Sequence, residues 1–276
     1  MPAYTARPNP RCMDLRVASL YRYPVKGLSP ERLARADLKT GGYFPADRLF
    51  AIENGPSGFD PAAPQHQAKI KFLMLMRNEA LARLTTRYDD ASATLTIEEG
   101  GREVARGDLS SKEGRLVVEA FFRRFMPKEL RGAPKLLAAP DGFRFTDSRR
   151  GFVSIINLGS VQAVEEMTGA PVEPLRFRGN IHVDGLAPWA ELDLVGKVIE
   201  SPSGLRLKVT KRIERCAATN VDPATGLRDL AIPRTLMQRL GHMDCGVYAE
   251  VVSSGTISEG ARLIVEEPAQ AALPLS

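Results

Sequence analysis

The 276-residue sequence contains only three cysteines and three histidines, and their positions exclude several classes of protein. Cys12, Cys216 and Cys245 are odd in number and far apart, so they do not form the disulfide framework of a small secreted domain. The histidines are equally scattered, and no CxxC, HxH or HExxH spacing occurs. We therefore do not expect a zinc ion that is held by protein ligands alone.

Long apolar runs are also missing from the chain. No segment approaches the roughly 18 consecutive apolar residues that a membrane-spanning helix needs, so no membrane partner is expected. Residues 1–14 are polar and proline-rich and lack the apolar core of a signal peptide, which predicts a disordered arm on a cytoplasmic protein. Nothing resembles a basic arm with interleaved aromatic residues, so nucleic acid is not an expected partner.

What the chain does contain is a series of short strand patterns within an ordinary globular composition, 43% hydrophobic and 26% charged. The net charge of +5 is a mild excess that is compatible with an anionic ligand, although a solvated basic surface is the commoner cause. Alternating and β-branched residues predict strands at 15–25, 48–53, 93–99 and 205–211, followed by a strand, a turn and a strand at 246–252, 255–260 and 261–267.

Helices are fewer than strands. A capping box of Ser110 and Glu113 predicts the start of one helix, and two shorter helices that end in glycine are predicted at 160–169 and 232–241. The turn-rich stretch 130–145 is interpreted as a linker between two halves of the chain. The predicted fold class is therefore mixed α+β and β-dominated, and the closely spaced strands favour a β-barrel or curled sheets.

Cys216 is the most informative single residue. It follows Arg212 and Arg215, which would favour the thiolate, the form that binds a metal or attacks an electrophile, and it precedes the turn-rich segment TNVDPATG. The alternative is a buried structural cysteine, which is the commoner fate of an unpaired thiol. One thiolate is too few ligands for a bare metal ion, but it suffices for a metal that arrives chelated by an organic cofactor.

A second group lies in the segment RFRGNIHVDG. If this segment is extended, Arg176, Arg178 and Asn180 point to the same side, because side chains alternate along a strand. The two arginines would then form a clamp for a phosphate or another multiply charged anion, with Asn180 as a neutral donor. The alternative is the charged outer face of a strand.

Further candidates for anion binding lie on turns in both halves of the chain. Lys26 precedes Gly27, which lets a ligand approach the backbone closely, and the pair Asp47–Arg48 opens a strand. The turn TDSRRG adds hydroxyl, carboxylate and guanidinium groups. Each of these groups alone is typical of a solvated surface, and it is their number that suggests an anionic ligand.

In the order in which they occur, several blocks resemble the MOSC family, which is named for the C-terminal domain of molybdenum cofactor sulfurase. The resemblance spans about residues 15–267 and implies an N-terminal β-barrel-like domain (15–135) packed on a MOSC β-barrel domain (136–267), between the arm 1–14 and a flexible tail 268–276. The two-domain order is similar to that of the mitochondrial amidoxime-reducing component and its bacterial relatives. The blocks are SLYRYPVKGLSPE, DRLFAIE, FTDSRRG, RFRGNIHVDGLAPWAE, RCAATNVDPATG and GVYAEVVSSGTISEGARLIV.

The resemblance also implies a cofactor site. Family members bind molybdenum through the dithiolene of a pterin and one protein cysteine, which explains why a single cysteine would suffice. RFRGN departs from the family pattern because Gly179 replaces a proline, which we expect to loosen that turn. The matching positions here are Cys216 for the metal; Lys26, Arg48, Arg178 and Asn180 for the cofactor; and Asp147, Ser148 and Arg149 along it, with Asp147 also a candidate for assisting proton transfer.

The implied function is a molybdenum-cofactor-dependent oxidoreductase that reduces N-hydroxylated compounds such as hydroxylamines and amidoximes. No ferredoxin-like extension follows the matching blocks, so the electrons would come from a separate donor such as a ferredoxin, a flavoprotein or a cytochrome b5-like protein. Pyridoxal phosphate is not expected. Two alternatives stay open: a protein that carries the molybdenum cofactor without turning over a substrate, and a sulfur carrier or sulfurtransferase that uses a persulfide on Cys216.

Overall fold

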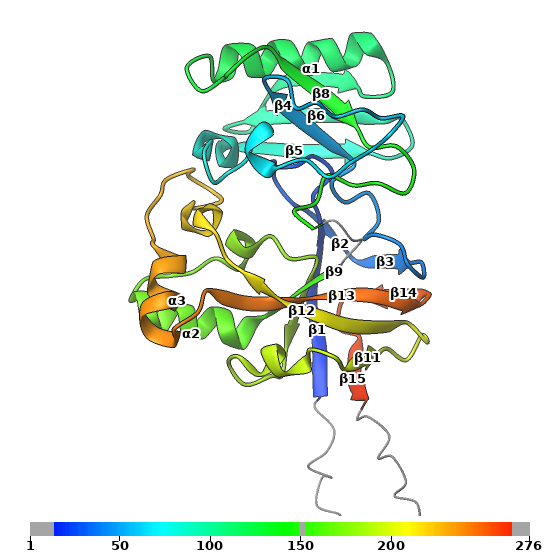
Figure 1. The fold of residues 1–276 in the computed structure, drawn as a ribbon, viewed down its shortest axis with the longest axis vertical. Coiled ribbons are helices and arrows are strands. Elements are labelled where there is room, and N and C mark those ends of the chain that lie inside the picture. Colours follow the sequence, from blue (N-terminus) through cyan, green and yellow to red (C-terminus); the bar gives the residue numbers. More distant parts are fainter. Residues whose placement is uncertain (1–13, 149–152, 267–276) are drawn as a thin grey trace, which may run out of the picture.

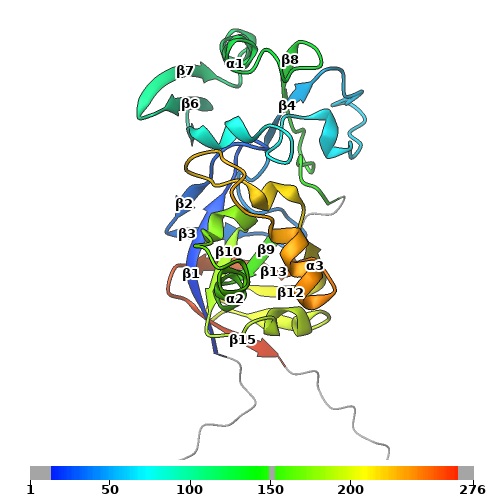
Figure 2. The same cartoon turned by 90° about the vertical axis from the view of Figure 1, so that its left-hand side faces the viewer.

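The computed structural model describes residues 14–148 and 153–266, arranged as two lobes along the long axis of the molecule (Figures 1 and 2). The fold is β-dominated with three α-helices in these residues, which confirms the predicted fold class. Cys12, Arg149 and the tail from residue 268 lie outside the described residues, as does the predicted arm up to residue 13. No helix in the described part is long and apolar enough to cross a membrane.

One lobe is a closed barrel. Its seven strands follow one another in the order β10, β9, β13, β12, β11, β15 and β1, and pairing of β1 with β10 closes the ring. Only β9 and β10 run parallel to each other. The strands are β1 (Asp14–Arg22), β9 (Val153–Asn157), β10 (Ile181–Asp184), β11 (Val198–Glu200), β12 (Arg206–Glu214), β13 (Asp244–Ser253) and β15 (Arg262–Glu266).

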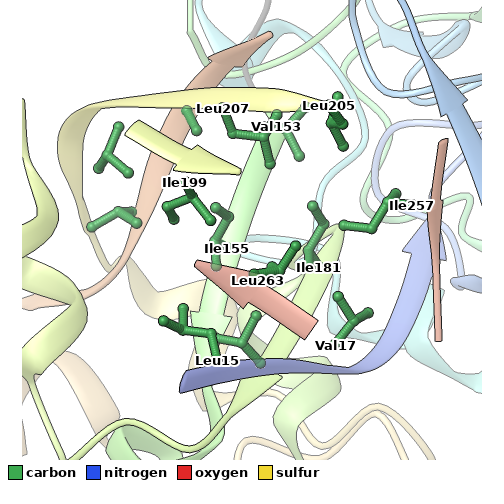
Figure 3. Close-up of a cluster of buried hydrophobic side chains, with 14 of the residues drawn as sticks. Leu15, Val17, Val153, Ile155, Ile181, Ile199, Leu205, Leu207, Ile257 and Leu263 are labelled. Atoms are coloured by element: carbon green, nitrogen blue, oxygen red, sulfur yellow. The ribbon is translucent and has the colours of Figure 1, made fainter. Parts of the chain in front are cut away.

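The barrel interior is filled by aliphatic side chains that alternate along each strand (Figure 3). On β12, Leu207 and Val209 are buried while Lys208 is exposed, as the alternation in the sequence predicts. Leu15 and Val17 of β1 complete the same core, next to side chains from the last strand. The first strand of the chain is therefore an integral part of a barrel that is otherwise built from the C-terminal half.

Strands from before residue 135 thus pair with strands from after residue 136. The domain boundary between these two residues stays a prediction. β2 (Glu31–Leu33) pairs with β1, and β3 (Arg35–Leu38) pairs with β14 (Gly255–Ser258). The segment 255–258 was expected to be part of a turn. It forms β14 instead, because β3 supplies a partner from a distant part of the chain.

The second lobe contains two small sheets and a helix. β4 (Phe50–Asn54) pairs with β8 (Pro134–Ala138), while β5 (Leu84–Asp89), β6 (Thr94–Glu99) and β7 (Arg102–Asp108) form a meander. The expected linker 130–145 therefore contains a strand. α1 (Lys112–Phe125) packs on β7 and β8 and is capped by Ser111, whose hydroxyl accepts from Gly114 N at 2.9 Å. The predicted cap Ser110 was wrong by one residue.

The other two helices pack against each other beside the barrel. α2 (Leu158–Thr168) and α3 (Ile232–Leu240) end at Gly169 and Gly241, both in the left-handed conformation, which confirms the predicted C-terminal glycines. Five short 3₁₀ helices also occur in the described residues: η1 (Lys69–Lys71), η2 (Glu79–Arg83), η3 (Pro174–Phe177), η4 (Ala190–Leu194) and η5 (Ala217–Asn220).

Candidate functional site

A cavity of about 460 Å³ is lined by both lobes. The segment that follows β12 rises from the barrel toward the other lobe (Figure 1), and Arg228 on this segment donates to Leu75 O and Met76 O, both at 2.9 Å. Every described residue that the sequence proposed for the site lines this one cavity: Lys26, Arg48, Asp147, Ser148, Arg176, Arg178, Asn180 and Cys216. Their functional roles stay predictions.

Cys216 lies where β12 ends and η5 begins, at the predicted transition from a strand to a loop. It occupies the N-cap position of η5, and its main-chain oxygen accepts from the hydroxyl of Thr219 at 2.9 Å. The residue is partly exposed, whereas Cys245 is completely buried. Burial raises the pKa of the Cys245 thiol to about 12, whereas Cys216 lines the cavity.

The two arginines that precede Cys216 are engaged with other groups. The buried guanidinium of Arg215 donates to Phe177 O at 2.8 Å and, through Nε, to Cys245 O at 2.6 Å. Arg212 donates to Leu192 O at 3.3 Å and lies beside two exposed or partly exposed carboxylates. Backbone carbonyls hold the guanidinium of Arg215, and its charge still interacts with Cys216. Arg212 lies near the surface, and the expected effect of the two arginines on the thiol stays a prediction.

Lys69 is a second basic residue, besides Arg215, whose charge interacts with Cys216. Burial lowers the pKa of Lys69, but the charge of Asp147 and the charge and hydrogen bond of Cys216 outweigh this effect, so the pKa is raised. Lys69 Nζ lies 3.9 Å from Asp147 Oδ2, while the other oxygen of Asp147 accepts a short hydrogen bond from Lys26. The carboxylate of Asp147 is thus placed between two lysines.

Asp147 is ionised at neutral pH. Although partial burial opposes the charge, Lys26, Lys69 and Arg48 lower the pKa of its carboxyl group to about 2. The group therefore has no proton to donate near neutral pH and is a weak base. This geometry favours a role in holding Lys26 over the predicted assistance with proton transfer.

A buried tyrosine organises the most basic part of the cavity. The guanidinium groups of Arg48 and Arg178 each lie 4.3 Å from the ring centroid of Tyr23, which is completely buried. Asp47 accepts from Tyr23 N at 2.8 Å and from Arg48 Nη1 at 2.6 Å. Tyr23 and Asp47 together hold two like charges side by side, which is costly unless an anion binds between them.

Two polar atoms of this cluster lack partners among the described residues: Nη2 of Arg178 and the hydroxyl of Tyr23. Burial and the neighbouring charge of Arg48 lower the pKa of Arg178 to about 10. Burial also raises the pKa of Tyr23 to about 12, so the tyrosine is neutral. A buried donor without a partner is rare in proteins, and here it is the group that an anionic ligand would satisfy.

Arg176 does not form the predicted clamp with Arg178. Pro174 begins the 3₁₀ turn η3, so the segment is not extended, and Arg178 ends the turn in the left-handed conformation with φ 53°. The buried guanidinium of Arg176 instead donates to both carboxylate oxygens of Asp229, at 2.8 and 2.7 Å, and to Asp222 at 3.2 Å. Arg176 therefore anchors the loop that follows Cys216.

Asn180 and Gly179 also have structural partners. The side-chain oxygen of Asn180 accepts from Ser154 N and Oγ, at 3.1 and 2.8 Å, and its nitrogen donates to Tyr21 O at 3.1 Å. A Cβ atom on Gly179 would lie 2.2 Å from Ile156 Cγ1. The side chain of Ile156 thus fills the space that a larger residue would need, and the expected loosening of the turn stays a prediction.

Models of two protein families match the chain. The MOSC N-terminal beta barrel domain matches residues 14–125, and the MOSC domain matches residues 143–263. The chain belongs to the MOSC family. This family is associated with binding of the molybdenum cofactor. No curated protein matches the chain.

The chain also has some similarity to two solved structures. The chain is 13% identical to the YUAD protein from Bacillus subtilis, with 92% of this chain and 97% of that chain covered and a TM-score of 0.44. It is 24% identical to YiiM from Geobacillus stearothermophilus, with 44% and 57% covered and a TM-score of 0.34. Within residues 14–148 and 153–266, no group of three or more His, Cys, Asp or Glu residues could hold a metal ion.

Sequence reasoning about this MOSC protein missed Lys69, Tyr23 and Tyr248 as members of the site. Lys69 comes from a segment with no motif of its own, so its position depends entirely on how the lobes pack. Tyr23 lies in the block SLYRYPVKGLSPE, just before the turn that carries Lys26. Nothing in this block indicates that the ring would contact two arginines from other segments. Tyr248 lines the cavity from β13, where it reads as an ordinary strand residue.

Proposed function

We propose that the cavity binds a molybdenum cofactor and that the loaded protein reduces N-hydroxylated compounds with electrons from a separate donor protein. The observation that carries this proposal is the combination of a partly exposed thiol at Cys216 with the unpartnered Nη2 atom of Arg178 in one cavity of about 460 Å³. The donor set fits the group: one soft sulfur ligand for a metal, and cations for a phosphate.

Three basic residues would hold the phosphate of the cofactor. Arg48 and Arg178 are presented together by Tyr23, and Lys26 is buried with its ammonium bonded to Phe145 O at 3.0 Å and to Asp147. Burial lowers the pKa of Lys26, and the charge of Asp147 opposes that effect. Asp147 therefore helps to keep the lysine protonated and pointed into the cavity.

The backbone beside Lys26 packs closely against the main chain at Leu73. Gly27 has φ +85°, and a Cβ atom there would lie 2.8 Å from Leu73 O. Only glycine fits this turn without strain, because the main chain of Leu73 fills the space that a Cβ atom would need. Cys216 would supply the protein ligand to the metal, and the bound cofactor would supply two-electron redox chemistry.

The overall reaction consumes two electrons and two protons for each N–O bond that is broken. A hydroxylamine or an amidoxime gives the corresponding amine or amidine and one molecule of water. The residues of this chain bind and orient the reacting groups and limit access of water, while a ferredoxin, flavoprotein or cytochrome b5-like protein would deliver the electrons.

The proposal is tested with protein purified from a host that makes the molybdenum cofactor. Benzamidoxime and a chemically reduced viologen are supplied, and formation of benzamidine is measured. We expect turnover by the wild type and by Cys245→Ala, in which only the buried cysteine changes, and none by Cys216→Ala. Cofactor-loaded protein that is inactive with every donor would indicate a cofactor carrier. Cofactor-free protein with one additional sulfur on Cys216 would indicate a sulfur carrier.

A further inference from the structure

Lys69 is separate from the phosphate-binding group of the cavity. The side chain of Lys26 is only 10% exposed and is held by two acceptors, whereas that of Lys69 is 36% exposed. Lys69 belongs to η1 in the lobe opposite the barrel, and Cys216 belongs to the loop that leaves the barrel. The packing of the lobes therefore brings an ammonium group to the thiol at the more open side of the cavity.

The ammonium of Lys69 retains capacity for another partner. Its 3.9 Å separation from Asp147 Oδ2 exceeds hydrogen-bond length, because Asp147 directs its other oxygen to Lys26. A lysine has three N–H donors, and both Lys69 and Cys216 line the cavity. A group that enters the cavity next to the thiol would therefore meet a cation.

We propose that Lys69 is a substrate-positioning residue that binds a carboxylate next to the reacting N–O group. The inference rests on the proposed reductase function and narrows its substrate class to N-hydroxylated compounds that carry an acidic group close to the nitrogen, as in N-hydroxyamino acids. Arg48 and Arg178 serve the cofactor phosphate, so Lys69 provides the separate positive charge that such a substrate requires.

The first test needs no cofactor and no turnover. Iodoacetate and iodoacetamide alkylate the same thiolate and differ in one carboxylate, so the ratio of their rate constants reports the charge near Cys216 and is independent of how much thiolate is present. The rates are measured on apoprotein by mass spectrometry of the peptide that contains Cys216. We expect Lys69→Met to lower the iodoacetate-to-iodoacetamide ratio about fivefold, as removal of one positive charge from the cavity that Cys216 also lines predicts.

Two further variants separate the effect of a charge at position 69 from the effect of any charge on the same turn. Lys71→Met removes the same charge from the same turn, but Lys71 is bonded to Ser57 O at 2.6 Å and Gln67 Oε1 at 2.9 Å and does not line the cavity, so the ratio should stay at the wild-type value. Lys69→Arg keeps the charge and should restore most of the ratio. An unchanged ratio in Lys69→Met, an equal fall in Lys71→Met, or a thiol that neither reagent reaches would overturn the proposal.

The second test uses the loaded enzyme. N-hydroxyglycine carries a carboxylate and N-hydroxyglycinamide carries an amide in its place, so the two substrates differ in one charge, as the two alkylating reagents do. Lys69→Met should raise the KM for N-hydroxyglycine about fivefold and leave its kcat nearly unchanged. The KM and kcat for N-hydroxyglycinamide should also stay nearly unchanged. Equal effects on both substrates would contradict the assignment. If neither substrate is reduced by any variant, the reductase function fails, and the alkylation ratios still decide whether Lys69 binds a carboxylate beside Cys216.

Discussion

Arg48 donates a hydrogen bond through Nη2 to the main-chain oxygen of Arg178, 3.1 Å away, although 130 positions separate the two residues. Both arginines have positive φ angles, 51° and 53°, which is uncommon for residues other than glycine. Such conformations cost free energy and occur where the surrounding structure requires them. Here they accompany two guanidinium groups that each lie 4.3 Å from the ring centroid of Tyr23.

The first prediction concerns this ring. Tyr23→Leu removes the aromatic contact of both arginines and should weaken cofactor retention about tenfold, from two cation–π contacts of about 0.5–1 kcal/mol each. Tyr23→Phe keeps the ring and should retain the cofactor within about threefold of the wild type. Pterin content per chain, measured after dialysis for increasing times, gives the comparison. Equal losses in both variants would assign the effect to the hydroxyl group instead.

The second prediction separates two neighbouring arginines. Arg178→Gln removes the unpartnered donor and should weaken cofactor binding about 10- to 100-fold with little loss of stability, as for one charge-assisted hydrogen bond. Arg176→Gln should instead lower the free energy of unfolding by about 1–2 kcal/mol, because Asp229 and Asp222 lose their partner but stay partly exposed.

Urea unfolding and pterin content, measured on both arginine variants, test this separation. If Arg176→Gln loses the cofactor while its stability is unchanged, the predicted clamp of the two arginines would be right after all.

The third prediction concerns the turn that carries Lys26. Gly27→Ala places a Cβ atom 2.8 Å from Leu73 O at a positive φ, and it should cost about 3 kcal/mol of stability and reduce cofactor content. Gly41→Ala is the matched control, because φ is +68° there and no atom lies within 4 Å of the added carbon. It should cost only about 1 kcal/mol and leave cofactor content unchanged. Similar losses in the two variants would contradict the account of the turn.

The fourth prediction concerns the dependence of stability on pH. Burial, with a smaller contribution from Arg215, lowers the pKa of His182 from 6.5 to about 4. Between these two values the unfolded chain binds a proton that the folded protein does not bind, so stability is full above pH 6.5 and falls toward pH 4. The loss from this one group is about 3 kcal/mol.

His182→Phe should remove that part of the pH dependence, since phenylalanine does not titrate. Urea unfolding of both proteins from pH 7 to pH 4 gives the difference directly. A difference between the two proteins that does not change with pH would show that His182 already titrates near its ordinary pKa.

Local features of the fold could be predicted from the sequence because local chemistry determines them. The glycines that end α2 and α3 have no Cβ atom to oppose a positive φ, and the alternation along β12 follows from the period of a strand. β14 was missed because its partner β3 lies more than 200 positions away, and no local pattern specifies that pairing.

In the candidate site, too, locally determined features could be predicted and features that depend on distant contacts could not. Motif residues such as Lys26, Arg48 and Cys216 were found from the sequence, since each lies on a recognisable turn or strand end. The predicted direction of the Arg176 side chain was wrong, because Pro174 starts a 3₁₀ turn where an extended segment was expected. The place of Lys69 depends on lobe packing, which leaves no trace in the residues around it.

The central claim is that Cys216 and the cationic cluster bind a molybdenum cofactor. Molybdenum and pterin are measured per chain in protein purified from a host that fills other molybdenum enzymes, for the wild type, Cys216→Ala and Cys245→Ala. The account predicts nearly one molybdenum and one pterin in the wild type and in Cys245→Ala, and loss of molybdenum in Cys216→Ala. Wild-type protein that contains neither molybdenum nor pterin would contradict it.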